Sequence, residues 1–261
     1  MLTEPPAFDT YYGGYFPEGV RRDSPLLARR YRDLLAGLGN LAPGRRLLEV
    51  GFGNGQLLAQ ARDGGWEIAG TELSEAQVAP GRARGLDVAA GDLVRDGLYL
   101  DRRFDAAVLI EVVEHLPDPT ETLRGVAERL VPGGVLYVTT PNVGALSRRL
   151  LGGRWSVFDR EHVTLMGPRA LKALLRRSGF RPLSVRSRNL NIAELRQALR
   201  GGSDGGDGHV RFDRPAAAAD LRDRIEASGP LRATKAVANS VLGATGAGDT
   251  LVAWARREGT P

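Results

Sequence analysis

Two acids and one histidine lie within the five-residue segment from Glu111 to His115, written E-V-V-E-H. If the chain forms one helical turn there, positions i, i+3 and i+4 share a face, so the side chains of Glu111, Glu114 and His115 converge. Two carboxylates and an imidazole suit a divalent cation, and oxygen-rich sites with one or two histidines favour Mg²⁺ or Mn²⁺. The structural alternative is that Glu114 and His115 hydrogen-bond the turn and cap the next helix.

Three glycines at alternate positions follow a mostly apolar segment. Residues 47–50 lead into Gly51, Gly53 and Gly55, and a helical pattern begins at Gln56. Glycine allows a positive φ and lets a ligand approach without a Cβ in the way, while the N–H groups of the following helix face that ligand. The spacing favours a site for a nucleotide-like ligand, and an ordinary tight turn between strand and helix is the alternative.

Acidic residues follow three further apolar segments. Glu72 lies 21 positions after Gly51, and a carboxylate about 20 residues after the first glycine suits the two hydroxyls of a ribose. Asp92 follows the next segment, where it could accept a hydrogen bond from an adenine amino group, and Glu111 follows the last. Because open α/β sheets bind ligands at the carboxyl ends of parallel strands, we expect these acids to face one site.

Alternating strand and helix patterns position these residues. Strands are predicted at 47–50, 66–72, 86–90, 104–110, 135–139, 180–186 and 250–256. Helices are predicted from Ser24-Pro25, from Gln56, from Asp118-Pro119 to Leu130, and across Leu171 to Ser178-Gly179. We expect Pro132-Gly133-Gly134 to end the third of these helices before the fifth strand. The alternation predicts an α/β fold with right-handed crossovers and a mostly parallel sheet.

The glycines form G-x-G-x-G with Glu49 two places before the first, whereas the dinucleotide fingerprint is G-x-G-x-x-G and Gln56 takes the place of its third glycine. With motifs further along, this pattern resembles class I S-adenosylmethionine-dependent methyltransferases over roughly residues 41–190 plus a final strand. The motifs in family order are Glu49 to Gly55, Glu72, Gly91-Asp92-Leu93, Phe104-Asp105, Pro132-Gly133-Gly134 and Thr139-Thr140-Pro141-Asn142. The resemblance implies a Rossmann-like, mostly parallel seven-stranded sheet with helices on both faces and an antiparallel last strand.

The resemblance also implies which residues bind S-adenosylmethionine. The loop from Gly51 to Gly55 and Glu49 would hold the methionine moiety, Glu72 the ribose, and Asp92 with Leu93 the adenine. The full set of implied cofactor-binding residues is Glu49, Gly51, Phe52, Gly53, Asn54, Gly55, Glu72, Leu73, Asp92, Leu93 and Glu111. Phe52 departs from the family pattern, which usually has a smaller residue between the first two glycines.

The E-x-x-E-H segment resembles two groups within this fold. In small-RNA 3′-terminal 2′-O-methyltransferases such a turn and a later histidine hold a metal that chelates a vicinal diol, and ubiquinone-pathway O-methyltransferases have the same turn and act on catechols. The resemblance implies Glu111, Glu114, His115 and His162 as metal ligands, with His162 and His115 as the catalytic residues. Without a metal, His162 becomes the preferred general base, because a histidine with a pKa near 6.5 accepts a hydroxyl proton at neutral pH.

The predicted reaction is methyl transfer from S-adenosylmethionine to a hydroxyl of a small molecule, such as a natural product or sugar with a diol or catechol. Methylation of an RNA 3′ end and N- or C-methylation with His162 as base stay open as alternatives. A nicotinamide oxidoreductase is disfavoured by the glycine spacing. A cofactor-binding protein without catalysis is disfavoured by the polar cluster beside the expected methyl group.

Four segments make up the predicted domain organisation. Residues 1–22 form an aromatic arm or lid, in which Tyr11 and Tyr12 are candidate substrate contacts, and residues 23–190 form the methyltransferase core. Residues 191–247 form a helical insertion with a glycine-rich loop, and residues 248–261 add the last strand. Trp155 is a further candidate for the substrate pocket, although a packed tryptophan is equally expected.

Composition restricts the remaining possibilities. The chain has no cysteine, so disulfide and thiolate chemistry are excluded. Its net charge of +5 permits an anionic partner, but arginines scattered among alanine and glycine do not indicate a nucleic-acid surface. No long apolar run predicts a transmembrane segment, so the cytoplasm is the default location. Oligomeric state cannot be read from the sequence.

Overall fold

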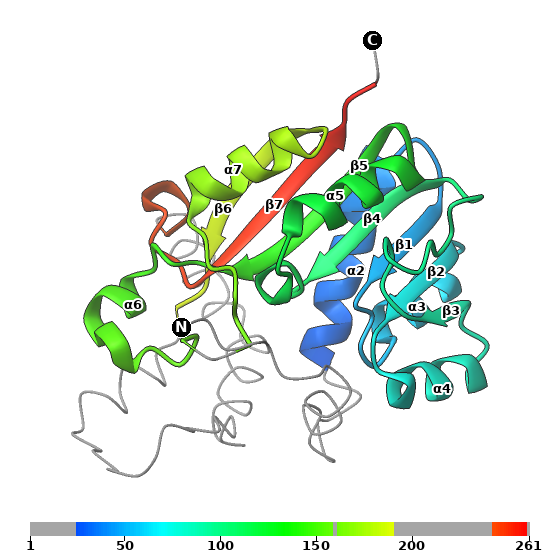
Figure 1. Cartoon of the computed structure of the whole chain (residues 1–261), viewed down its shortest axis with the longest axis horizontal. Helices are drawn as coiled ribbons and strands as arrows, with labels where there is room; N and C mark the ends of the chain where they lie inside the picture. Colours follow the sequence, from blue (N-terminus) through cyan, green and yellow to red (C-terminus); the bar gives the residue numbers. More distant parts are fainter. Residues whose placement is uncertain (1–24, 159–160, 191–241, 260–261) are drawn as a thin grey trace.

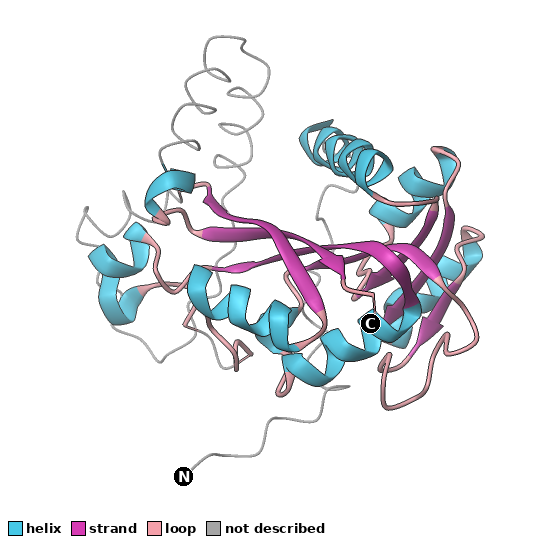
Figure 2. Ribbon diagram, turned by 90° about the horizontal axis from the view of Figure 1, so that it is seen from above, coloured by secondary structure: helices cyan, strands magenta, loops and turns pink. Residues whose placement is uncertain are grey.

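A computed structural model describes residues 25–158, 161–190 and 242–259 of the chain. These residues form one sheet with helices on both faces (Figures 1 and 2). The strands are β1 (Arg46–Val50), β2 (Glu67–Glu72), β3 (Val88–Ala90), β4 (Phe104–Ile110), β5 (Leu130–Pro141), β6 (Phe180–Arg188) and β7 (Thr250–Arg257). The helices are α2 (Pro25–Leu41), α3 (Gln56–Asp63), α4 (Glu75–Ala83), α5 (Pro119–Arg129), α6 (Leu146–Leu151) and α7 (Pro168–Arg177), with short 3₁₀ turns η1 (Val113–His115) and η2 (Gly152–Arg154).

The sheet confirms the predicted fold class. Its strand order is β3-β2-β1-β4-β5-β7-β6, and β1 pairs in parallel with β2 and β4. The pairs β2–β3 and β4–β5 are also parallel, whereas β7 is antiparallel to both β5 and β6. The carboxyl ends of β1 to β6 therefore lie at one edge of the sheet, which is the edge where ligands bind in folds of this kind.

Strands β3 and β5 differ from their predicted starts by more than one residue. Strand β3 begins at Val88 rather than at position 86. Strand β5 begins at Leu130, so Pro132-Gly133-Gly134 lies inside the strand instead of before it. A register shift between β4 and β5 accommodates this segment, and Gly133 there has a positive φ of 79°. Helix α5 still ends at Arg129, close to its predicted end.

The sheet separates two apolar cores. On one face, residues of α5 and α7 pack on β4, β5 and β7, and Leu123, Leu171 and Leu175 are fully buried there. On the other face, α2 and α3 pack on β1, β2 and β4, with Leu38 and Leu58 fully buried. Burial of this apolar surface fixes the strand ends, and with them the loops that hold the candidate site.

Phe52 has a structural explanation in the second core. Its side chain is 4% exposed and packs among residues of α3 and β2 rather than facing the ligand edge. Space for the ring exists because two neighbours are glycines: a Cβ on Gly70 would lie 3.0 Å from Phe52 Cδ1, and a Cβ on Gly81 would lie 3.5 Å from Phe52 Cε2. Because the side chain of Phe52 is buried, only the backbone of this residue can contact a cofactor.

We expect Gly70→Ala to lower the free energy of unfolding by about 1–3 kcal/mol, because overpacking forces shifts in a dense core. The added Cβ would lie 2.6 Å from Leu58 Cδ1 as well as 3.0 Å from Phe52. Chemical denaturation measures the effect. The control is Gly39→Ala on α2, where the added Cβ would lie 3.9 Å from the nearest side-chain atom, Trp66 Cζ2, and alanine favours the helix. Equal stability changes in the two variants would contradict the packing explanation.

Several predictions fall outside the described residues. These are the aromatic arm at 1–22 with Tyr11 and Tyr12, the Ser24 cap, and residues 191–241 of the predicted insertion. Within the described residues, no helix is both long enough and apolar enough to span a membrane.

Candidate active site

The glycine loop has the backbone that its sequence predicts. Gly51, Gly53 and Gly55 have φ values of 71°, 53° and 69°, in the left-handed region where side chains are strained. Gly51 N and Phe52 N donate hydrogen bonds to Thr71 O, at 2.8 Å and 3.2 Å, which fastens the loop to β2. The loop thus places backbone N–H groups and the start of α3 at the ligand edge of the sheet.

Asn54 supports the loop from within. Its Oδ1 accepts a hydrogen bond from Gln56 N at 3.2 Å, and its carbonyl oxygen accepts one from the Arg84 guanidinium. The side chain of Asn54 therefore stabilises the loop. If Asn54 contacts the cofactor as predicted, we expect the contact to come from the backbone of the loop.

Glu72 lies directly against the glycine loop. Its Oε2 accepts a hydrogen bond from Gly53 N at 3.0 Å, and its Oε1 accepts bonds from Leu73 N at 2.9 Å and Ser74 N at 3.3 Å. The carboxylate is thereby fixed in position: Oε1 already accepts two hydrogen bonds, whereas Oε2 accepts one and keeps a second lone pair for a ribose hydroxyl. Leu73 follows at the end of β2 with its side chain 38% exposed.

Asp92 organises the turn after β3. Its Oδ1 accepts hydrogen bonds from Val94 N and Arg95 N, both at 2.9 Å. Leu93 is 2% exposed, and its side chain belongs to the core, so only its backbone can face an adenine. The structure brings these two residues to the expected edge but gives both of them local structural contacts as well.

Glu49 is a buried acid on β1. The side chain is 4% exposed, and its Oε2 has no hydrogen-bond partner among the described residues. Burial raises the pKa of Glu49 well above its usual range, and the negative charge of Glu72 raises it further. A buried carboxyl of this kind is suited to a cationic group such as the ammonium or sulfonium of the cofactor, which would favour its ionised form.

The raised pKa of Glu49 predicts how the ligand-free protein responds to pH. Above the usual pKa of a glutamate, the unfolded chain loses this proton while the folded chain keeps it, so stability falls as pH rises toward the folded-state pKa. Glu49→Gln removes the effect. We expect its stability gain over the wild type at pH 8 to exceed that at pH 5 by at least about 1.4 kcal/mol, the equivalent of one pKa unit.

Thermal or urea unfolding of both proteins at the two pH values measures this difference. The added amide has the same packing cost at both pH values, so the comparison isolates the titration. An equal effect at pH 5 and pH 8 would mean that Glu49 has an ordinary pKa in the folded protein.

Glu114 is a second buried acid, in η1 after β4. It is 1% exposed, and its Oε2 accepts a hydrogen bond from Thr140 Oγ1 at 3.0 Å. Its Oε1 is buried with no donor among the described residues. Burial raises the pKa of Glu114 well above its usual range, and the negative charge of Glu111 adds to this effect. A positive ligand facing Oε1 would satisfy the atom and lower that pKa.

His115 and His162 lie against each other, with ring centroids 4.8 Å apart. His115 Nδ1 lies 3.2 Å from Glu161 O, and His162 Nδ1 lies 2.7 Å from Val157 O. Because a carbonyl oxygen only accepts, each Nδ1 is assigned the proton, and each Nε2 becomes the basic nitrogen. Metal-binding histidines commonly have this arrangement, in which one ring nitrogen donates to a carbonyl and the other binds the metal.

Two hydrogen bonds bring the distant His162 to the turn. Thr164 N donates to Glu114 O, and Thr164 Oγ1 donates to Leu116 O, both at 2.9 Å. As a result, one ligand atom from each of Glu114, His115 and His162 lies within 4.8 Å of the others. This group spans 48 positions of sequence and matches three of the four residues predicted to hold a metal.

Glu111 lies beside this group but in a different geometry from the one predicted. The expected helical turn from Glu111 is replaced by η1, which begins only at Val113. Glu111 itself is exposed and has a positive φ of 54°, which is unusual for a glutamate. Its backbone N donates to Thr139 O at 3.1 Å, so it stays at the ligand edge, next to Glu114.

Trp155 is packed rather than open. Its indole is 2% exposed and meets Phe158 edge to face at 5.3 Å, in a small cluster with Ala145 and Leu151. Trp155 is thus packed, as the alternative expectation has it, and supports the segment that precedes His162, while a substrate contact by this residue stays a prediction.

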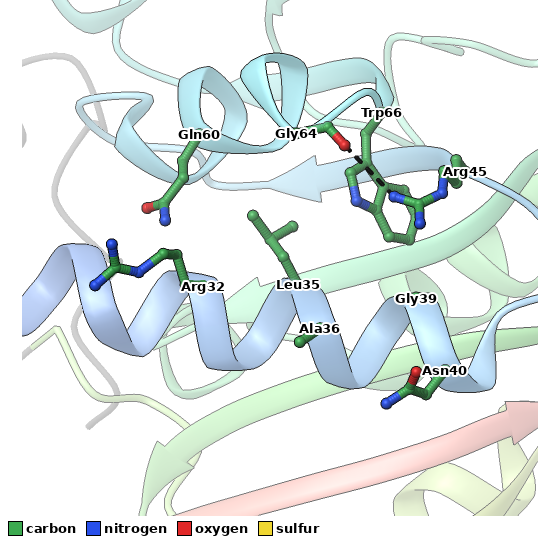
Figure 3. A pocket seen from close by; sticks show the side chains of 9 residues that line it. All are labelled: Arg32, Leu35, Ala36, Gly39, Asn40, Arg45, Gln60, Gly64 and Trp66. Atoms are coloured by element: carbon green, nitrogen blue, oxygen red, sulfur yellow. Dashed lines mark hydrogen bonds between the residues drawn. The ribbon is translucent and has the colours of Figure 1, made fainter.

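A pocket of about 300 Å³ lies between α2 and α3 (Figure 3). Arg45 and Trp66, which precede β1 and β2, line it, together with Arg32 and Gln60. It therefore lies toward the amino ends of the strands, opposite the glycine loop and the Glu114 group. This pocket does not belong to the candidate site.

The fold, the glycine loop and the acids at the strand ends define a class I S-adenosylmethionine-dependent methyltransferase. A family model described as a methyltransferase domain matches residues 21–185, and the chain belongs to this family. It is 31% identical over 108 residues to the ubiquinone biosynthesis O-methyltransferase of Marinobacter nauticus, covering 38% of this chain and 45% of that protein. It is 26% identical over 166 residues to the enzyme of the same name from Bordetella avium, and this match covers 57% of this chain and 67% of that protein. The matches thus span about half to two thirds of these relatives.

Solved structures share the fold. A methyltransferase from Archaeoglobus fulgidus superposes with a TM-score of 0.59 at 19% identity, covering 95% of this chain and all of that one. The [4+2]-cyclase SpnF superposes with a TM-score of 0.54 at 25% identity, covering 93% of this chain and 86% of the cyclase. Because a cyclase shares the fold, the reaction has to be argued from the site itself.

Thr140 and Thr164 were not predicted as site residues. Thr140 lies in the motif Thr139-Thr140-Pro141-Asn142, and its hydroxyl is the donor to Glu114. The motif could have indicated Thr140, since it lies at the carboxyl end of the neighbouring strand β5, whereas no sequence pattern marks Thr164.

Proposed function

We propose that this chain transfers the methyl group of S-adenosylmethionine to a hydroxyl oxygen of a small molecule that has a vicinal diol or a catechol. The observation that supports the proposal is the convergence of Glu114, His115 and His162 within 4.8 Å at the end of β4. The names of the O-methyltransferase relatives agree with it.

The chemistry requires little from the protein beyond placement and proton removal. The sulfonium is already a strong electrophile, so the acceptor oxygen has to lie in line behind the methyl carbon and lose its proton. The glycine loop and Glu72 would hold the cofactor at the edge of the sheet. In the proposed arrangement, the Nε2 atoms of His115 and His162 would face the hydroxyl group of the methyl acceptor.

The donor set fits a divalent cation. The group comprises a buried carboxylate oxygen that accepts no hydrogen bond from the described residues, and two imidazoles whose Nδ1 atoms lie at carbonyl oxygens. Carboxylates suit Mg²⁺ and Mn²⁺, and imidazole suits transition metals, so the mixed set of Glu114, His115 and His162 favours Mn²⁺ over Mg²⁺. Glu111 lies close enough to contribute negative charge. A cation bound there would lower the pKa of the acceptor hydroxyl and orient both oxygens of a diol.

If no cation is bound, His162 is the candidate base. Its Nδ1 donates to Val157 O, which fixes the ring and leaves Nε2 to accept the hydroxyl proton. Glu114 then supports the turn through Thr140.

A labelled methyl-transfer screen over catechols, glycosides and RNA, with and without a chelator, tests the proposal. We expect transfer to catechols that a chelator abolishes and Mn²⁺ restores. Transfer to RNA with none to small diols would assign the RNA reaction instead. Absence of binding to S-adenosylmethionine and to S-adenosylhomocysteine would overturn the proposal as a whole.

A further inference from the structure

One face of β6 and β7 presents two arginines at a small pocket. Ser184 is directly opposite Trp254, and Arg186 is directly opposite Val252, in the antiparallel pair. Opposed residues of such a pair share a face of the sheet, and Arg188, two positions after Arg186, lies on that face too. These five residues line a pocket of about 150 Å³.

The arginines lie toward the same edge of the sheet as the candidate site. Strand β6 is parallel to β5, because β7 is antiparallel to both, so Arg188 ends β6 at the ligand edge. Arg186 shares a row of the sheet with Val252 and Thr139, and Thr139 binds the backbone N of Glu111. Two strand spacings, or about 10 Å, separate β6 from β5 there.

No carboxylate of the described residues pairs with the charge at this pocket, which belongs to Arg186 and Arg188. Burial raises the pKa of Tyr137 on β5, the positive charge of Arg188 acts to lower it, and the negative charge of Glu111 acts to raise it. The Tyr137 hydroxyl thus lies in the field of both Arg188 and Glu111.

We propose that Arg186 and Arg188 bind an acidic group of the methyl acceptor, so that the acceptor is a diol or catechol with a carboxylate or phosphate. The inference rests on the proposed function and adds the substrate class. Guanidinium groups present a planar fork of donors that matches both oxyanions, and such charge-assisted bonds are the strong ones. The hydroxyl of Ser184 provides a further donor at the same pocket.

Calorimetry on the full chain loaded with S-adenosylhomocysteine tests the anion site directly. The probes are 3,4-dihydroxybenzoate, 3,4-dihydroxybenzylphosphonate and the neutral 3,4-dihydroxybenzamide. We expect the wild type to bind the preferred acid at least about tenfold more tightly than the amide, in line with a hydrogen bond to a charged group. The double variant Arg186→Gln/Arg188→Gln should lose this preference, and Arg188→Lys should keep part of it. The better of the two acids identifies the oxyanion.

Arg181→Gln is the matched control, because Arg181 is an exposed arginine at the opposite end of β6. Equal binding of acids and amide by the wild type would overturn the inference, as would an equal loss in Arg181→Gln and the double variant. Methyl-transfer assays with the same probes separate the two proposals. Binding preference without transfer refutes the reaction alone, whereas transfer without preference refutes the anion site alone.

Discussion

Glu72→Ala is expected to weaken the binding of S-adenosylmethionine by about 100-fold. The carboxylate accepts hydrogen bonds from Gly53 N at 3.0 Å and Leu73 N at 2.9 Å, so it holds the glycine loop as well as the expected ribose site. Bonds to a charged group contribute about 1.5–3 kcal/mol each. Losing the loop contact and one ribose contact would remove about 3 kcal/mol, which corresponds to this factor.

Isothermal titration with S-adenosylmethionine and S-adenosylhomocysteine measures the change. Glu67→Ala is the control on the same strand, since Glu67 is an exposed acid at the amino end of β2 and forms an ion pair with Arg102 at 3.2 Å. Glu72→Gln keeps the shape but not the charge, and we expect it to lie between Glu72→Ala and the wild type. Indistinguishable affinities for Glu72→Ala and Glu67→Ala would remove Glu72 from the cofactor site.

The sequence was sufficient to predict the sheet because its strands are short apolar segments with turn residues between them. Strand β4 has its predicted limits, and β7 differs from its predicted end by one residue. The amino-terminal half of β5 was missed, since proline and two glycines normally end regular structure. Here a register shift tolerates them, and such a shift depends on the partner strand rather than on local sequence.

The candidate site was predictable only in part. Glycines at alternate positions indicate positive φ values directly, and Gly51, Gly53 and Gly55 have them. The geometry of Glu111 could not be predicted, because nothing in a glutamate indicates a left-handed backbone. The orientation of Phe52 likewise depends on the space that Gly70 provides from another strand.

Two buried acids at one edge of the sheet favour a ligand with positive charge. Glu49 and Glu114 each have a buried oxygen without a hydrogen-bond partner in the described part of the chain. Such groups cost stability in an empty site and are retained where function needs them. The cofactor has a sulfonium and an ammonium, and the proposed divalent cation would add further charge, so two separate positive groups could account for two separate acids.

Glu114→Gln and His162→Ala are each expected to lower kcat by about 10²- to 10⁴-fold, the range of a general acid or base. The loss in both variants is the result expected of the cation mechanism, and the result for Glu114→Gln separates it from the histidine-base mechanism. With a cation, both variants remove a ligand, and both lose Mn²⁺ binding while keeping their affinity for S-adenosylhomocysteine. With His162 as the base and no cation, Glu114→Gln retains activity because glutamine can still accept the hydrogen bond from Thr140.

Turnover, Mn²⁺ titration and cofactor affinity measured on the same preparations distinguish these mechanisms. Glu121→Gln, which changes an exposed acid on α5, is the matched control for loss of a negative charge. If a chelator leaves turnover unchanged while His162→Ala abolishes it, the cation is not required and the histidine acts as the base. If both variants keep full turnover, the convergence of Glu114 and His162 is structural, because neither proton removal nor ion binding then depends on it.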